Sequence, residues 1–486
     1  MPLQMFNQEF HGKVRRLAGR LGRGFCVAAA LSLPLHLTVP MASAQEQSPQ
    51  KRPSIIRDTE IEALLRDYTR PILKTAGLAQ QNVEVVLISE RSFNAFVADG
   101  KRIFVNTGAL IDSTTPNQII GVLAHETGHI AGGHLARMRE QLAGAQTMAI
   151  VAMMLAAGGI AAGAASGMNG RDVGNVGAAA MSAPQEAIRR SLLSYQRGEE
   201  QAADRSAVKY LDATGQSSKG MLETFERFQS DQLFISQRID PYLLSHPMAR
   251  ERVAALEQLA KASPYYNVKD PPALQARHDM MRAKLIAFME RPDTVARRYP
   301  ASDGSMAAQY ARAISAYRFG NVQNAVAQID ALIAKEPNNP YFYELKGQAL
   351  LESGRAAEAV PPLRKAVAMT GGAPLIRSML GQALVQSGSP STNQEALREL
   401  IQATQRDPNS PSAWRSLAMA YGRAGDTANA DLAAAQGYFA SGEFKTGREL
   451  AARARQSFPQ GSPGWLKADD LVSFKPPQNA AANRGQ

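Results

Sequence analysis

Small residues recur at a fixed interval through the last third of the chain, and this recurrence restricts the fold more than any other feature of the sequence. Glycine returns after 34, 34 and 37 residues, and alanine after 34, 37 and 34. The residues are Gly320, Gly354, Gly388 and Gly425, followed by Ala325, Ala359, Ala396 and Ala430. Because paired helices need small residues where they cross, a period of this length indicates a row of helical hairpins.

Other positions indicate which helical repeat this is. Trp414, Leu417 and Tyr421 have the spacing of the first helix of a tetratricopeptide unit. Prolines close several units, at Pro337, Pro408 and Pro459. We therefore predict an α-helical tetratricopeptide solenoid over residues 301–460, with an atypical last unit that acts as a cap. Residues 461–486 are expected to form a flexible tail.

The first 44 residues have the three parts of a secretory signal peptide. A basic stretch ends at Arg23, an apolar stretch runs roughly from Phe25 to Val39, and a small-x-small site ends at Ala44. The apolar run is too short for a spanning helix, so cleavage after Ala44 is favoured over an uncleaved anchor. The only cysteine, Cys26, lies in this leader, so the mature chain suits an oxidising compartment without relying on disulfides. The leader therefore predicts export from the cytoplasm.

The charge excludes one class of function. The formal net charge is +11, and five of the basic residues lie in the leader. The remaining excess is spread along the chain, without a polybasic run or interleaved aromatic residues, so nucleic acid is not an expected partner.

The segment 55–260 combines several helices with a few short strands. Apolar spacing predicts helices near 55–76, 118–136, 188–213 and 217–234, and a loop that leads into a helix over 241–259. A strand is expected at 83–88, and a hairpin at 95–105 with its turn at Asp99-Gly100. The hairpin would offer an edge strand with which an extended peptide can pair. The predicted fold is thus mainly α: an α-rich domain over 55–260 with a small β-hairpin or sheet, a helical linker over 261–300, and the solenoid.

The helix at 118–136 carries the strongest chemical signal. His125 and His129 are spaced i, i+4 and lie on one helix face, where two neutral imidazoles can bind one Zn²⁺. Glu126 lies between them, near a water ligand whose pKa zinc lowers to about 7, and can take the proton of that water. Gly128 and Gly132 weaken the helix by about 1 kcal/mol each relative to alanine, which indicates another demand at these positions.

A third protein ligand is required. A metzincin would have histidine at position 135, which is Leu135, and His134 misses this position by one. A glutamate on a later helix is the other usual solution, and Glu200 and Asp204 are spaced i, i+4 within 199–204. One of the two can ligate while the other orients a ligand or donates a proton.

These blocks together resemble a known family. The order of 94–96, 103–108, 125–129, 200–204 and 245–252 is similar to that of the HtpX and CAAX-prenyl-protease type of zinc metallopeptidase. The resemblance implies that His125, His129 and Glu200 bind one zinc per chain, that Glu126 is the catalytic base and that Asp204 is its acidic partner. Relatives often carry a second glutamate at the position of Ala202, so Glu199 is a less favoured alternative ligand.

With a signal peptide and repeats, the chain is most similar to periplasmic members of that family. This resemblance implies that the chain is an endopeptidase with a chaperone-like role in the assembly and quality control of outer-membrane β-barrel proteins. Implied partners are misfolded or stalled outer-membrane proteins, the barrel-assembly machinery through the repeats, the lipopolysaccharide-export barrel, and peripheral contact with a membrane. The alternative function is a mainly non-proteolytic repeat chaperone or scaffold with a latent protease site.

Two features leave alternatives open. His246, between Ser245 and Pro247, either caps the helix that begins near Met248 or reaches the active site. In the active site it would be an inhibitory fourth zinc ligand or an oxyanion donor, and we favour the former. The apolar stretch 145–168 is too rich in glycine and alanine for a good spanning helix. It is either a buried helical hairpin or a flap or surface that contacts membrane or unfolded clients.

Overall fold

The computed structural model describes residues 54–148, 170–234, 242 and 246–475. The predicted leader and its cleavage site lie outside these ranges, as does most of the apolar stretch 145–168. Among the described helices, none is long and apolar enough to cross a bilayer.

The strands form one four-stranded sheet in the order β1-β2-β4-β3. Their bounds are β1 Ile55–Ile56, β2 Glu84–Ile88, β3 Ala95–Val97 and β4 Arg102–Asn106. Strand β2 pairs parallel to β4, and β3 pairs antiparallel to β4 with Phe96 opposite Phe104. The hairpin predicted at 95–105 is confirmed: Asp99 accepts hydrogen bonds from the backbone N–H groups of Lys101 and Arg102, and Gly100 adopts a positive φ of 78°. Strand β3 lies at the edge of the sheet.

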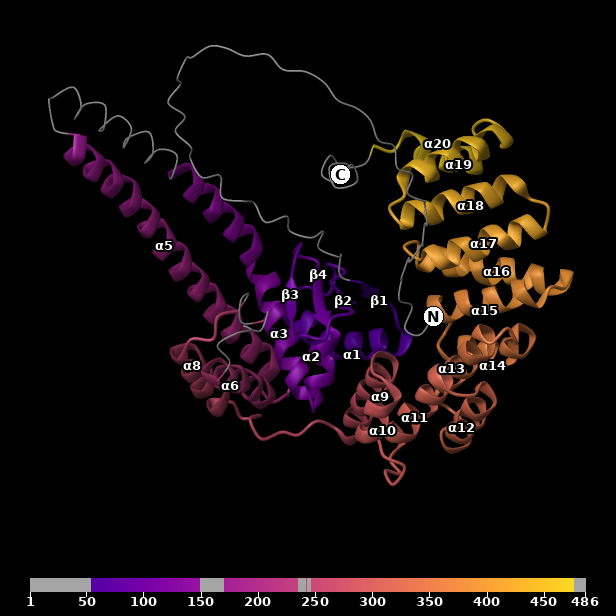
Figure 1. Cartoon of the computed structure of the whole chain (residues 1–486), viewed down its shortest axis with the longest axis horizontal. Helices are drawn as coiled ribbons and strands as arrows, with labels where there is room; N and C mark the ends of the chain where they lie inside the picture. The colour runs from indigo at the N-terminus through magenta and orange to yellow at the C-terminus, as the bar shows by residue number, and fades with distance from the viewer. Residues whose placement is uncertain (1–53, 149–169, 235–241, 243–245, 476–486) are drawn as a thin grey trace, which may run out of the picture.

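Helices make up the rest of this domain. They are α1 Thr59–Thr75, α2 Thr107–Asp112, α3 Pro116–Gly132, a helical run over 134–148, α5 Gly170–Ala213, α6 Lys219–Phe234 and α8 Arg250–Ala262. The helix predicted to continue to 136 instead ends at Gly133, whose left-handed backbone (φ 67°) caps α3 and turns the chain into the next helical run. Helix α5 begins well before the predicted residue 188 and projects away from the domain (Figure 1).

The remaining helices stack into a curved array on the other side of the molecule (Figure 1). Their bounds are α9 Pro272–Met289, α10 Pro292–Arg298, α11 Met306–Phe319, α12 Val322–Lys335, α13 Pro340–Glu352, α14 Ala356–Met369, α15 Pro374–Ser387, α16 Pro390–Arg406, α17 Pro411–Arg423, α18 Thr427–Ala440, α19 Phe444–Ser457 and α20 Pro463–Ser473. The predicted fold class, an α-rich domain with a small sheet followed by a helical solenoid, is confirmed. Ala325, Ala359 and Ala396 are fully buried, as helix crossings require.

Both ends of the predicted array differ from the expectation. The segment assigned to a flexible tail contains helix α20, which packs on α19 through the buried Ala468. The tail prediction is therefore wrong for residues 463–473, where Ser462 caps the helix and Pro463 starts it. In the segment assigned to a helical linker, α9 packs against α1 and α11, so it joins the two parts through a shared core rather than spacing them apart.

One continuous core connects the sheet domain to the first repeats. A single cluster of buried apolar side chains extends from Ile56 on β1, through Met281 and Phe288 on α9, to Tyr310 on α11 and Ala349 on α13. The start of α1 therefore packs against helices more than 200 residues away in the sequence.

A buried cluster of charges lies within this junction. Lys284 on α9 forms ion pairs with Asp58 (2.8 Å) and Glu60 (3.1 Å) at the start of α1. The hydroxyl of Tyr310 donates to Glu60 (2.9 Å), and Asp58 also caps α1 by accepting from the N–H of Ile61. Buried charges are tolerated only when they are paired. The contacts of Lys284 and Tyr310 with Glu60 therefore link α1, α9 and α11.

Replacing Lys284 by methionine should destabilise both sides of the junction. Asp58 and Glu60 would lose their buried cation, and removing one partner of such a pair costs about 3–5 kcal/mol. Hydrogen exchange followed by mass spectrometry should show lost protection in α1 and in α11–α13 together. The matched control is Lys346→Met, which breaks a partly exposed pair with Asp330 and should cost at most about 1 kcal/mol. Loss of protection in the repeats alone would contradict the shared junction.

Glu344 gives this junction a pH dependence. It accepts a hydrogen bond from the Thr59 hydroxyl (3.3 Å), and its other oxygen has no partner among the described residues. Burial raises the pKa of Glu344 from 4.5 to about 8, with Lys284 opposing the shift. The unfolded chain releases this proton near its ordinary pKa, whereas the folded chain holds it. Stability therefore falls as pH rises between these two values, by about 1.4 kcal/mol per pKa unit.

Replacing Glu344 by glutamine, which cannot ionise, should remove that loss. The stability of Glu344→Gln relative to the natural chain should rise from pH 5 to pH 8 and then level off. Urea unfolding across this range measures the difference, with the exposed Glu336→Gln as control. A difference that stays constant with pH would show that Glu344 does not titrate as described.

Candidate metal centre

The site is built where α3 and α5 cross. Gly128 on α3 faces the backbone of α5, and a Cβ at this position would lie 2.9 Å from the carbonyl oxygen of Ala203. The absence of a side chain therefore lets the two helices approach closely. This contact explains one of the two glycines within the histidine helix, and it brings Glu200 on α5 opposite His125 and His129 on α3.

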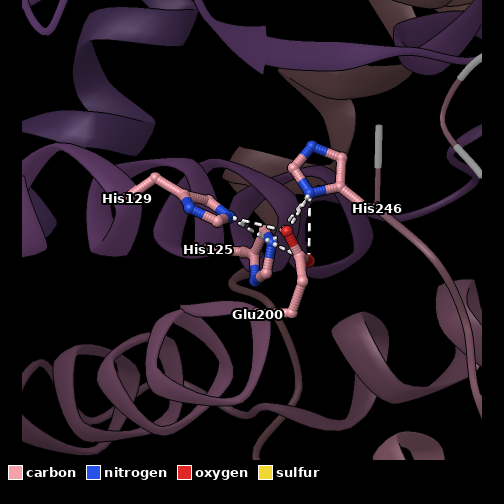
Figure 2. Close-up of side chains that lie close together, drawn as sticks. All are labelled: His125, His129, Glu200 and His246. Atoms are coloured by element: carbon pink, nitrogen blue, oxygen red, sulfur yellow. Dashed lines mark hydrogen bonds and ion pairs between the residues drawn. The ribbon is translucent and has the colours of Figure 1, made fainter. Parts of the chain in front are cut away.

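Four side chains converge on one point (Figure 2). The ligand atoms of His125, His129, Glu200 and His246 all lie within 4.8 Å of one another. The Nε2 atoms of His125 and His129 are 3.0 Å apart, and each lies 3.4 Å from a carboxylate oxygen of Glu200. The Nδ1 atom of His246 lies 3.1 Å from both oxygens of Glu200 and 3.3 Å from Nε2 of His125.

These distances fit a tetrahedral zinc ion. With bonds of about 2.0–2.1 Å to nitrogen and oxygen, the ligand atoms of a tetrahedron are about 3.3 Å apart. The ring protons agree with this assignment. Nδ1 of His125 lies 2.9 Å from Asp204, and Nδ1 of His129 lies 2.9 Å from His134. If both Nδ1 atoms donate, both Nε2 atoms present lone pairs toward each other, an arrangement that a cation between them stabilises.

Asp204 and Arg252 hold His125 in place. Arg252, on α8, donates two hydrogen bonds to Asp204 (2.6 and 2.8 Å), and its Nη1 also pairs with Glu200 (2.7 Å). Burial lowers the pKa of His125, but the carboxylates of Asp204 and Glu200 raise it to about 9, so a metal that binds Nε2 would displace a proton from it. Asp204 lies behind His125 and contacts that ring and Arg252, so it acts as a partner that orients the imidazole.

Glu126 is fully buried, and neither of its carboxylate oxygens has a hydrogen-bond partner among the described residues. The nearby Nε2 of His246 lies 3.4 Å from Oε1. Burial raises the pKa of Glu126, because the charged form loses hydration. An orphaned, buried carboxylate with a raised pKa beside a metal site has the properties of a general base that meets a water molecule.

His246 reaches the cluster, so its role as a helix cap is wrong. The N-cap residue of α8 is Ala249, and no side chain caps it. The N–H of His246 instead donates to the carbonyl of Tyr242 (2.7 Å), and the two rings pack with their centres 4.7 Å apart. Pro247 follows, and the imidazole of His246 points toward Glu200 and His125 (Figure 2).

Sequence reasoning missed two residues that the structure brings to this centre. Arg252 lies in the 245–252 block of the family pattern, but no role was assigned to it from the sequence. The signal that could have found it is its place in that block, six residues after His246. His134 was considered only as a misplaced third ligand, yet it contacts His129. The alternative ligand Glu199 points elsewhere and pairs with His134 (2.9 Å) and Arg137 (2.7 Å).

A pocket of about 510 Å³ adjoins the cluster. One wall is a face of α5 that includes Leu193 and Gln196, and the other is formed by 247–249 and the first turn of α8, with Glu200 and Arg252 between them. Such a pocket can hold a side chain of a molecule that reaches the metal ligands.

Comparison with known sequence families identifies both parts of the chain. Residues 57–260 match peptidase family M48, and residues 310–374 and 378–431 match the tetratricopeptide repeat. The metal cluster falls within the first match, and the helical array contains the other two.

Comparison with individual proteins gives relatives over most of the chain. A protein of Escherichia coli K12 named beta-barrel assembly-enhancing protease is 26% identical over 419 residues, which are 84% of this chain and 81% of the relative. A protein of the same name from Yersinia pestis is 23% identical over 75% of this chain and 73% of its own length. A solved structure of MamA is 18% identical and aligns with 33% of this chain and 90% of its own, with a TM-score of 0.27.

Proposed function

This chain is a metallopeptidase whose residues 57–260 belong to family M48, and from that premise we propose that it is a zinc endopeptidase acting on outer-membrane proteins in the periplasm. The observation that carries the proposal is the convergence of two imidazoles and one carboxylate beside an orphaned buried glutamate. His125, His129 and Glu200 would hold one zinc ion. When bound, zinc lowers the pKa of a water ligand and polarises a carbonyl group.

The residues of the chain would divide the work of hydrolysis. Glu126 takes a proton from the attacking water as the oxygen joins the peptide carbonyl carbon, and passes it to the nitrogen as the C–N bond breaks. Asp204 keeps His125 in the orientation that presents Nε2, and Arg252 holds Asp204 and Glu200 in register. Strand β3, at the sheet edge beside α3, would pair with an extended stretch of substrate.

His246 would act as a latch. Three protein ligands leave one tetrahedral position on zinc for water, and Nδ1 of His246 lies within 3.1–3.3 Å of Glu200 and His125, which supports it as a fourth ligand. While it occupies that position, the nucleophile is displaced and the peptidase is latent. The same observation favours a second candidate function, a repeat chaperone or scaffold whose protease site is rarely used.

The proposed substrates and location rest on the relatives and on the leader. The relatives are named for enhancing β-barrel assembly, which supports a role for this chain in that process. Misfolded or stalled outer-membrane proteins are the proposed substrates, and the repeats are the proposed contact with the barrel-assembly machinery. Contact with the lipopolysaccharide-export barrel and with a membrane surface belongs to the same proposal.

The signal-like first 44 residues and the absence of cysteine after them support cleavage after Ala44 and a periplasmic mature chain. We propose domain limits of 55–260 for the peptidase and about 301–460 for the repeats.

The first prediction from this function separates metal binding from catalysis. The purified chain should hold one zinc, and Glu200→Gln should lower its occupancy because a charged ligand is lost. Glu126→Gln should keep the metal and lose proteolysis because only the base is gone. Elemental analysis and a generic protease assay measure the two effects, with the exposed Glu140→Gln as a matched control. Full activity in Glu126→Gln would end this mechanism.

The second prediction concerns the latch. His246→Ala should raise proteolysis of an unfolded substrate and self-cleavage, because the fourth position on the metal becomes open to water. A large fall in kcat would instead assign His246 as an oxyanion donor. The double variant with Glu126→Gln should be inactive, which controls for contaminating proteases. Unchanged proteolysis with unchanged metal coordination would exclude both roles.

A further inference from the structure

The two histidines of the proposed zinc site are held from behind in different ways. Nδ1 of His125 faces a carboxylate, Asp204, at 2.9 Å. Nδ1 of His129 faces another imidazole, Nδ1 of His134, also at 2.9 Å. His134 is 94% buried, and its ring lies nearly perpendicular to that of His129, with the centres 4.9 Å apart.

The chain folds sharply to make this contact. Helix α3 ends at Gly133 in a left-handed conformation, and the N–H of Gly133 bonds back to the carbonyls of His129 and Ile130. The next residue, His134, is thereby turned back over the last turn of α3. Its ring covers Gly132, where a Cβ would lie 2.1 Å from Nε2 of His134. Gly132 is thus required by the His134 ring, which explains the second glycine within the histidine helix.

A charged pair fixes the proton on His134. Its Nε2 lies 2.9 Å from Glu199, an acceptor, so Nε2 carries a proton. Arg137 anchors Glu199 at 2.7 Å and also donates to the hydroxyl of Tyr195 (3.2 Å). Nε2 of His129 lies among the other ligand atoms of the cluster, so a neutral His129 that binds a metal carries its proton on Nδ1. Nδ1 of His134, 2.9 Å away, is then the acceptor for that proton.

We propose that His134, held by Glu199 and Arg137, is a positioning residue that fixes the tautomer and direction of His129. If His129 carried its proton on Nε2 instead, that nitrogen could not bind a metal. This inference rests on the proposed zinc site and adds to it a set of three side chains outside the ligands. Partners of this kind commonly change metal affinity 10- to 100-fold when they are removed.

Two isosteric substitutions test the inference on the full-length mature chain. Asparagine places its side-chain oxygen near the position of Nδ1, whereas glutamine places its amide near the position of Nε2. His134→Asn should therefore keep an acceptor for His129, and His134→Gln should lose it. Zinc affinity is measured by competition with a chelator, and metal geometry by the visible spectrum of the cobalt-loaded protein. We expect His134→Gln to lose 10- to 100-fold in affinity with an altered spectrum, and His134→Asn to stay within a few-fold.

A second pair of variants approaches the same contact from the backbone. Gly132→Ala should displace the His134 ring and reproduce the loss of affinity, whereas Gly144→Ala, with open space around it, is the matched control. Circular dichroism verifies that each variant is folded.

Unchanged affinity and spectrum in His134→Gln would overturn the positioning role. Equal losses in His134→Asn and His134→Gln would also overturn it, because packing rather than hydrogen bonding would then be the cause. If the natural chain itself binds no zinc, the proposed function fails. If the natural chain binds zinc and the His134 variants keep its affinity and spectrum, only this inference fails.

Discussion

The close approach of α3 and α5 at Gly128 is the constraint on which the metal centre depends. A methyl group at this position would meet the backbone of α5 and push the helices apart. Glu200, which lies on α5, would then move away from the two imidazoles on α3. The cost of a glycine in a helix is about 1 kcal/mol, and here it is offset by a contact that lets a carboxylate join two histidines.

Several buried charges accompany this contact, and the cation among them compensates the carboxylates only in part. Glu200 and Asp204 are both at least 96% buried and share one buried cation, Arg252. Burial of a carboxylate is costly without a partner, and a divalent metal at the cluster would supply the rest of the compensating charge. The same principle operates at the other end of the domain, where Lys284 compensates Asp58 and Glu60. Both clusters join segments that are distant in sequence.

The sequence was sufficient for the parts of the fold that follow local rules. The 34-residue period predicted the repeats, and the turn at Asp99-Gly100 predicted the hairpin, because each depends on neighbouring residues. The spacing of His125 and His129 likewise indicated one helix face. The sequence was not sufficient for His134, because its role depends on a backbone reversal at Gly133 that the helical pattern conceals. The junction around Lys284 was also missed, because an ion pair between residues 58 and 284 has no signal in periodicity.

X-ray absorption spectroscopy of the zinc-loaded, full-length chain at neutral pH tests the central claim most directly. The account predicts one four-coordinate zinc with nitrogen and oxygen ligands at about 2.0–2.2 Å. Multiple scattering should correspond to three imidazoles, from His125, His129 and His246, with one carboxylate from Glu200. A six-coordinate shell of oxygen atoms without imidazole scattering would contradict it, because the four converging side chains would then not be the metal ligands.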